Sequence, residues 1–289
     1  WRCATQTPAF GRSPAVEAGM NPRNGLRPEA HIALLIDADN SPAAKIDAIL
    51  TELSTFGVTN VRRAYGNWKK NELKSWEEKL HEHAIRPMQQ FDYSKGKNAS
   101  DMAMVIDALE LLYTDRPDAF GIVSSDADFT PLVMHLRAKG AAVYGFGAQK
   151  TPEPFVHACS RFLYLERLGI AESVEPAVVP EITATTEVVG APVKRPPSLR
   201  VSPEELKKDA KLISLLRGAV IACEDETGWA KVGPVGTHIG NKASFDSRNY
   251  GYATLSKLLT ATGVFELREE GTPKVSVRDK RHFLVQSTR

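Results

Sequence analysis

The chain has 289 residues, of which 42% are hydrophobic and 25% charged, and its net charge is +2. This composition is that of an ordinary globular protein, and the length allows one large domain or two smaller ones. The charge is too small to indicate a nucleic-acid partner by itself, and no apolar run approaches the roughly 20 residues of a membrane span. Cys3, Cys159 and Cys223 are far apart and lack metal-ligand spacing. We therefore expect a reduced, cytoplasmic protein without disulfides and without membrane contact.

Residues 1–30 are rich in Pro, Gly, Arg and Ala and show no periodicity. This pattern predicts a disordered lead-in, and the segment lacks the apolar core of a secretion signal. Because the sequence opens on Trp1 and Met20 stands just before the first patterned segment, we expect Met20 to be the natural start.

Short apolar runs alternate with segments of helical periodicity from residue 31 onward. Strands are expected over residues 32–36, 61–65, 85–91, 119–123 and 141–146. Helices are expected over residues 43–53, 72–83, 101–113 and 130–138, and the segments 155–160 and 162–165 close the unit. This alternation predicts βαβ units, and hence a three-layer α/β domain over residues 31–168 with a mainly parallel sheet.

A second, smaller domain is expected after a break in this pattern. Residues 169–202 are rich in proline and have no period, which predicts a flexible linker. Helices are expected over residues 206–222 and 252–262, and the glycine-punctuated segment 228–241 is left unassigned. A hairpin of 264–267 with 274–277 would complete a winged-helix-like α+β domain over residues 203–289.

The run from Ile32 to Ile36 leads directly into Asp37, Asp39 and Asn40. A short apolar run of this kind is typical of a strand buried on both faces, and open α/β sheets bind ligands at the carboxyl ends of such strands. Two carboxylates released there would repel each other unless a cation neutralised them, which favours Mg²⁺ or Mn²⁺. The alternative is that Asp39 or Asn40 only caps the following helix.

Two further segments bring acids toward the same edge of the sheet. The fourth strand is followed by Asp126 and Asp128, and Asp101 opens the third helix. If the strand order switches direction between the first and fourth strands, one crevice would hold Asp37, Asp126 and Asp101. A metal bound there could activate a water and stabilise the leaving oxygen of a phosphodiester.

Several neighbouring residues could support that chemistry. Asn40, Ser124 and Ser125 could orient the carboxylates or the water, and Lys95 and Lys97 could hold a phosphate. The two lysines could equally belong to a solvated loop. Asp107 lies off the helical face of Asp101, and we expect it at the surface or just behind the site.

Three motifs in this order resemble the NYN domain of the PIN-like nuclease superfamily, closest to its LabA-related bacterial branch. They are LLIDADN at 34–40, Asp101 at a helix start after a lysine-containing loop, and VSSDADFTPLV at 123–133. The resemblance covers about residues 30–168. It implies a metal-dependent ribonuclease with Asp37, Asp101, Asp126 and Asp128 as acidic residues and Asn40 supporting Asp37.

Two alternatives stay open. The first is an RNA-binding or regulatory adaptor whose acidic site is weak or silent. The second is a HAD-type phosphatase, in which Asp37 would attack phosphorus and Asp39 would act as acid and base. The phosphatase pattern calls for Thr or Val two residues beyond Asp39, where Ser41 stands, and it leaves Asp101 unexplained.

The second domain resembles an OST-HTH (LOTUS) domain. The likeness rests on Gly228-Trp229, Val232-Gly233, Phe245-Asp246, Tyr250-Gly251-Tyr252, 255–259 and 264–267. It implies binding of RNA, including G-rich or structured RNA, and contacts with other proteins. The residue types favour Lys231, Lys242 and Arg248 as phosphate contacts and Tyr250 as a stacking ring, whereas Trp229, Phe245 and Tyr252 are expected in the core.

Overall fold

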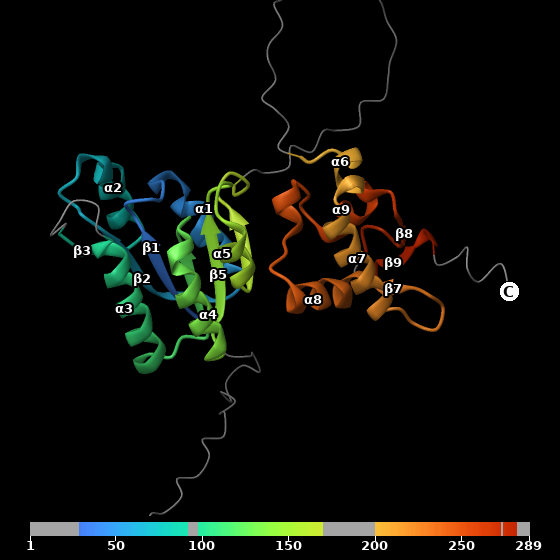
Figure 1. Cartoon of the computed structure of the whole chain (residues 1–289), viewed down its shortest axis with the longest axis horizontal. Helices are drawn as coiled ribbons and strands as arrows, with labels where there is room; N and C mark the ends of the chain where they lie inside the picture. The colour runs from blue at the N-terminus through green and yellow to red at the C-terminus, as the bar shows by residue number, and fades with distance from the viewer. Residues whose placement is uncertain (1–28, 92–97, 170–199, 273, 282–289) are drawn as a thin grey trace, which may run out of the picture.

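The computed structural model describes residues 29–91, 98–169, 200–272 and 274–281. The expected lead-in before residue 29, the lysine loop with Lys95 and Lys97, and the linker over 170–199 lie outside these described residues. The described chain forms two parts: an α/β domain, and a smaller helical domain with its own sheet (Figure 1).

The α/β domain is built on a six-stranded sheet in which every pairing of neighbouring strands is parallel. The order is β3-β2-β1-β4-β5-β6. The strands are β1 (His31–Asp37), β2 (Val58–Gly66), β3 (Arg86–Gln89), β4 (Ala119–Val123), β5 (Ala142–Gly147) and β6 (Arg161–Tyr164). The predicted neighbourhood of the first and fourth strands is confirmed, since Ile36 pairs with Val123.

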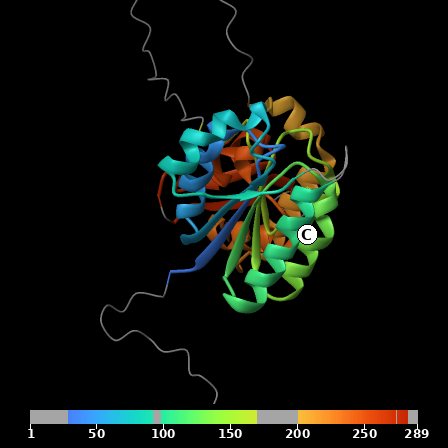
Figure 2. The same cartoon turned by 90° about the vertical axis from the view of Figure 1, so that its left-hand side faces the viewer.

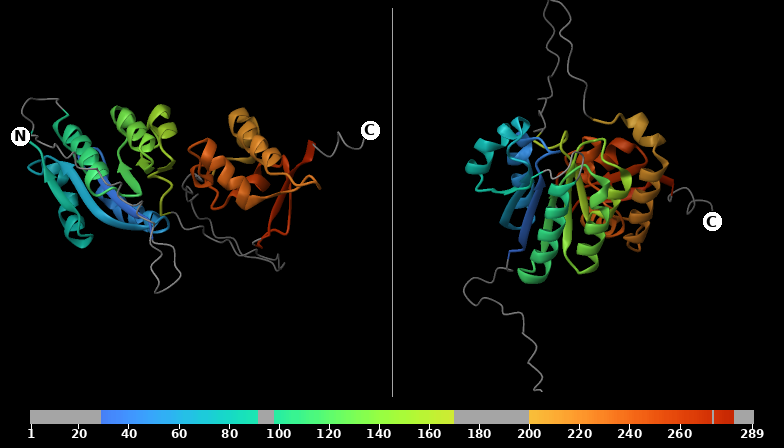
Figure 3. Two further views of the ribbon diagram at one scale, coloured as in Figure 1. Left: turned by 90° about the horizontal axis from the view of Figure 1, so that it is seen from below. Right: turned by 60° about the vertical axis from the view of Figure 1, so that its left-hand side comes forward.

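Helices cover both faces of this sheet, as the alternating pattern predicts. They are α1 (Ile46–Ser54), α2 (Lys74–Glu82), α3 (Ala99–Thr114), α4 (Thr130–Ala138) and α5 (Glu153–Ala158), with short 3₁₀ turns η1 (Ala43–Lys45), η2 (Asn71–Leu73) and η3 (Ala127–Phe129). Figure 2 and the left view of Figure 3 show α1 and α2 on one side of the sheet and α3 to α5 on the other.

The side chains of β1 alternate between the two cores that result. Ile32, Leu34 and Ile36 pack in the core with α1 and α2, whereas Ala33 and Leu35 pack in the core with α3, α4 and α5. All five side chains are buried, which explains the continuous apolar run. Asp37 continues the second set, so its carboxyl group lies on the face that α3 covers.

The smaller domain has four α-helices among the described residues: α6 (Pro203–Lys208), α7 (Ala210–Ala222), α8 (Val232–Lys242) and α9 (Leu255–Thr262). They pack with the antiparallel sheet β7-β9-β8, formed by Ala230–Lys231, Ser276–Asp279 and Phe265–Arg268. The 3₁₀ turn η4 (Ser247–Tyr250) connects α8 to α9. The expected combination of helices and a terminal hairpin is confirmed.

Two details of this domain differ from the sequence analysis. The expected helix over 206–222 is broken at Asp209, because its side chain accepts the Leu212 N–H and starts α7 anew. The unassigned segment contains α8, which forms despite its glycines because Val232, Val235 and Ile239 fall on one buried face. No helix of the described residues is long and apolar enough to cross a membrane.

Candidate active site

Asp37 is the most buried carboxylate at the carboxyl edge of the large sheet, with 1% of its surface exposed. The Asn40 amide donates to both of its oxygens at 3.1 and 3.3 Å, and the Ser124 hydroxyl donates at 3.0 Å. Burial raises the pKa of Asp37 against the opposing effect of these hydrogen bonds. The predicted support of Asp37 by Asn40 and Ser124 is therefore a direct contact, which fixes the carboxylate in one orientation.

The contact between Asp37 and Ser124 follows from the register of the sheet. Ile36 and Val123 are paired, so the next residue of each strand emerges beside the other. The Ser124 hydroxyl also accepts the Asp126 N–H at 3.1 Å, and Asp126 accepts the Asp128 N–H at 2.8 Å. This chain of hydrogen bonds links the end of β1 to η3, which carries Asp128.

Asp39 belongs to the same group of acids and is held from two sides. Its Oδ2 accepts the Ser100 hydroxyl at 2.9 Å, and its Oδ1 pairs with the Lys70 ammonium at 3.2 Å. Ser100 lies in the first turn of α3, so this bond ties the start of the helix to the end of β1. Asp101, in the same turn, is thereby placed toward the crevice.

Electrostatics shows that the acids act on one another. The pKa of Asp101 is raised to about 6, first by desolvation and then by the charges of Asp37, Asp126, Asp39 and Asp128. Five carboxylates from three separate chain segments thus share one edge of the sheet. We refer to them below as the acidic crevice. Oxygen donors of this kind are the ligands that Mg²⁺ and Mn²⁺ prefer, so the donor set suits such an ion. Among the described residues, however, three ligand atoms come within 4.8 Å of one another only at Asp47, Glu82 and His83, outside the acidic crevice.

Two residues of the crevice were not identified from the sequence as site residues. Lys70 follows β2 in a loop, and Ser100 lies in the first turn of α3, where its hydroxyl donates to Asp39. No local pattern connects either residue to Asp39, which lies 31 and 61 positions away respectively.

Ser125 has a different contact from the one expected. Its hydroxyl accepts the Ala148 N–H at 2.8 Å, which joins the loop after β4 to the loop after β5. Asp107 accepts from Arg63 at 2.9 Å and from the Tyr65 hydroxyl at 2.8 Å, and so anchors α3 on β2 beside the site. Ser125 and Asp107 therefore stabilise chain segments next to the acidic crevice.

A second acidic group lies on α1 and α2. Ligand atoms of Asp47, Glu82 and His83 lie within 4.8 Å of one another. The Lys79 ammonium pairs with Asp47 at 3.3 Å and with Glu82 at 2.7 Å. Because the chain's own cation lies among these carboxylates, the group is a surface ion-pair network.

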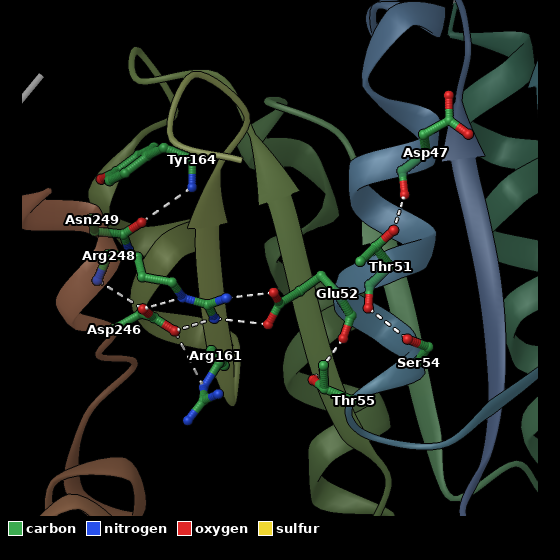
Figure 4. A network of polar contacts seen from close by, with 10 residues as sticks. All are labelled: Asp47, Thr51, Glu52, Ser54, Thr55, Arg161, Tyr164, Asp246, Arg248 and Asn249. Atoms are coloured by element: carbon green, nitrogen blue, oxygen red, sulfur yellow. Dashed lines mark hydrogen bonds and ion pairs between the residues drawn. The ribbon is translucent and has the colours of Figure 1, made fainter. Parts of the chain in front are cut away.

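The residues expected to bind RNA in the smaller domain separate into two sets. Lys231 and Lys242 are exposed at opposite ends of α8. Arg248 and Tyr250 are engaged within the protein. The Arg248 guanidinium binds the carboxylates of Asp246 and Glu52, as Figure 4 shows.

Tyr250 packs against Phe245 with ring centroids 6.1 Å apart, and burial raises its pKa to about 12. These contacts argue against Arg248 as a phosphate contact and against Tyr250 as a stacking ring. Trp229, expected in the core, is instead half-buried beneath Arg268 and Arg278, whose guanidinium carbons lie 4.4 and 4.5 Å from its ring centroid.

Comparison with known families agrees with this architecture. Residues 31–166 match the NYN domain and residues 206–277 match the OST-HTH/LOTUS domain. The chain therefore carries an NYN domain followed by an OST-HTH/LOTUS domain. The first suggests a ribonuclease-type hydrolase, and the second points to RNA binding.

Individual relatives add little about function. An uncharacterised protein of Methanocaldococcus jannaschii is 32% identical over 125 residues, which cover 42% of this chain and 49% of that protein. The chain thus spans about half the length of this curated relative. Among solved structures, a protein of unknown function from Vibrio parahaemolyticus is similar at 19% identity and a TM-score of 0.39, covering 47% of this chain and 93% of the other. An uncharacterised protein from Nitrosomonas europaea has 26% identity, a TM-score of 0.24 and coverages of 34% and 92%.

Proposed function

We propose that the protein is a metal-dependent ribonuclease that cleaves RNA phosphodiester bonds at the acidic crevice. The observation that carries the proposal is the convergence of five carboxylates at one edge of the sheet, where burial, and then the charges of the other four, raise the pKa of Asp101 to about 6. Interacting acids at the carboxyl edge of a parallel sheet are costly unless a cation offsets their repulsion. The NYN domain supplies the expectation that the substrate is RNA.

Asp37, Asp101, Asp126 and Asp128 would hold the ion, which is Mg²⁺ or Mn²⁺ in this proposal. When bound, such an ion lowers the pKa of a water and stabilises the leaving oxygen of a phosphodiester. Asn40 and Ser124 keep Asp37 in one orientation, because three hydrogen bonds of 3.0 to 3.3 Å restrict its carboxylate. Ser100 and Lys70 do the same for Asp39.

The OST-HTH/LOTUS domain supports the choice of RNA over DNA as the substrate. In this proposal its exposed Lys231 and Lys242 contact phosphates of the bound RNA. Lys95 and Lys97, outside the described residues, remain predicted phosphate contacts of the NYN domain.

The test is cleavage of labelled single-stranded and structured RNA in Mn²⁺, Mg²⁺ or EDTA. The wild type should cut in the presence of metal, and Asp37→Asn/Asp126→Asn should lose cleavage while still binding RNA. Asp115→Asn is the matched control, because this exposed carboxylate follows the last residue of α3, at the end opposite Asp101. It should cut as the wild type does.

Equal background cleavage in all three proteins, with RNA still bound, would favour the adaptor over the ribonuclease. Turnover of a small phosphomonoester through a covalent aspartyl phosphate would favour the phosphatase.

A further inference from the structure

The segment from Asp246 to Asn249, which we call the docking segment, joins the OST-HTH/LOTUS domain to the NYN domain. It comprises the first three residues of η4 and the residue that caps this turn, since the Asp246 side chain accepts the Arg248 N–H at 2.9 Å. Figure 4 shows this segment facing α1 and β6 of the large domain. Its contacts are of two kinds, an ion-pair anchor and a backbone contact.

The anchor is the Arg248 guanidinium between two buried carboxylates. It donates to Asp246 from Nε at 2.9 Å and from Nη2 at 2.7 Å, and to Glu52 from Nη2 at 2.7 Å and from Nη1. The side chains of Asp246 and Glu52 are only 6% and 9% exposed. These carboxylates hold the pKa of Arg248 above its usual value, with the hydrogen bond to Asp246 as the largest cause.

Glu52 is informative because it belongs to the other domain. A carboxylate so little exposed is costly unless a cation is paired with it. Its partner lies 196 residues away along the chain. The exposed fraction of Glu52 is that of the docked chain, so its burial and its pairing with Arg248 arise together where the two domains meet.

The backbone contact involves β6, the edge strand of the large sheet. The Asn249 side chain donates from Nδ2 to the Phe162 carbonyl at 2.8 Å and accepts at Oδ1 from the Tyr164 N–H at 3.2 Å. The Leu165 N–H, in contrast, donates to the Gly147 carbonyl of β5. The backbone N–H and C=O groups of Phe162 and Tyr164 therefore point away from β5.

This pair of bonds has the pattern of a parallel ladder. In a parallel ladder, a residue donates its N–H to the carbonyl of residue i on the neighbouring strand. Its own carbonyl accepts the N–H of residue i+2 on that strand. The amide of Asn249 does both, with Phe162 as i and Tyr164 as i+2. Its side chain thus takes the place of one residue of a seventh strand, and it covers an edge that could otherwise pair with another chain.

We infer that the OST-HTH/LOTUS domain is docked on the β6 edge of the NYN domain in solution, through the bonds of Asn249 to β6 and the ion pair of Arg248 with Glu52. The two domains then tumble as one body. A further consequence, which rests on the proposed ribonuclease function, is that bound RNA approaches the acidic crevice from a fixed direction. The docking itself does not depend on that function.

The test is nuclear magnetic resonance of the intact, isotope-labelled chain. In the wild type, both domains should show one rotational correlation time, and the Tyr164 amide should be protected from hydrogen exchange. Asn249→Ala should speed exchange of the Tyr164 amide at least about tenfold. The Leu165 amide, bonded inside the sheet, should not change.

Arg248→Met/Asn249→Ala should give the two domains separate, shorter correlation times. Arg268→Met is the matched control, because this exposed arginine lies in β8, away from the large sheet in Figures 1 and 3. It should behave as the wild type.

Two results on the wild type alone would overturn the inference. One is exchange of the Tyr164 amide at the rate of an unprotected amide. The other is two different correlation times for the two domains. Neither measurement requires a variant to fold, and neither depends on catalytic activity, so failure of the docking can be distinguished from failure of the ribonuclease proposal.

Discussion

Carboxylates cluster in two buried or half-buried parts of the molecule, and the two clusters differ in how their charges are balanced. At the docking segment, Asp246 and Glu52 share the Arg248 guanidinium, which bonds to both oxygens of each. In the acidic crevice, five carboxylates interact, and Lys70 pairs with Asp39 at 3.2 Å. At the docking segment the chain supplies the cation. In the acidic crevice, the ion pairs among the described residues set one lysine against five carboxylates.

This difference separates a structural role from a functional one. A buried ion pair with complete hydrogen bonds holds two parts of the chain together, and removing its cation leaves uncompensated charge. Clustered acids with shifted pKa values instead mark a site that is suited to an external cation. The surface group of Asp47 and Glu82 resembles the first case, because Lys79 pairs with both.

The comparison is tested most directly by one aspartate from each place. Asp126→Asn should lower the rate of RNA cleavage about 100-fold or more, because it removes a charge that the proposed metal needs. The amide keeps the oxygen that accepts the Asp128 N–H, so stability should hardly change.

Asp246→Asn should instead affect stability and leave RNA cleavage nearly unchanged. It should lower the free energy of unfolding by about 1–2 kcal/mol and leave the cleavage rate within about twofold of the wild type. Cleavage rates and urea unfolding of both variants provide the measurement. Equal effects of the two substitutions on both quantities would contradict the distinction.

Arg248→Met should destabilise the protein by about 2 kcal/mol, measured by urea unfolding, because it leaves Glu52 buried without its cation and Asp246 with only the longer contact to Arg161 at 3.8 Å. The side chain of Arg248 is 33% exposed, which places the expected loss below the usual cost of breaking a fully buried pair. Adding Glu52→Gln should recover part of the loss. Arg268→Met loses an exposed contact with the Trp229 ring and should cost less than about 1 kcal/mol. A loss as large as that of Arg248→Met would contradict a special role of the ion pair with Glu52.

Stability of the metal-free protein should depend on pH through Asp101. Its folded pKa of about 6 lies above the ordinary value of 3.8, so the folded state binds more protons between these values than the unfolded state. Stability should therefore fall as pH rises from about 4 to 6, by about 1 kcal/mol after allowance for solvent screening of this half-buried group.

Urea unfolding in EDTA at pH 4.5 and pH 7.5 measures this change. Asp101→Asn should reduce it to the contribution of Asp37, whose pKa burial also raises, and the Asp115→Asn control should leave it unchanged. Stability that rises over this interval in the wild type, with the same slope in Asp101→Asn, would show that repulsion in the crevice is small.

The smallest effect is expected from the exposed cations, which differ from Arg248 in having no buried carboxylate to balance. Lys231→Ala/Lys242→Ala should weaken RNA binding several-fold and reduce the slope of log K against log salt by about 1 to 1.5. Binding titrations at several salt concentrations measure both. Arg248→Met, if folded, should leave the slope unchanged; a change equal to that of the lysine variant would return Arg248 to the RNA-binding surface.

The sequence by itself determined the order of strands and helices in the large domain and the edge at which its acids gather. It could do so because these features depend on local periodicity and on the handedness of βαβ connections, which hold whatever the distant contacts are. The run from Ile32 to Ile36 is continuous because both faces of β1 are buried. Its position beside β4 then brings Asp37 next to Ser124.

Only the tertiary structure decided which side chains meet across long stretches of chain. Lys70 and Ser100 bind Asp39, and Arg248 binds Glu52, through contacts for which the sequence has no pattern. The helix α8 forms because packing of its buried face outweighs the cost of its glycines, a balance that propensity alone misjudges. The local pattern around Arg248 was that of an exposed cation, and the surface of another domain made it a structural residue.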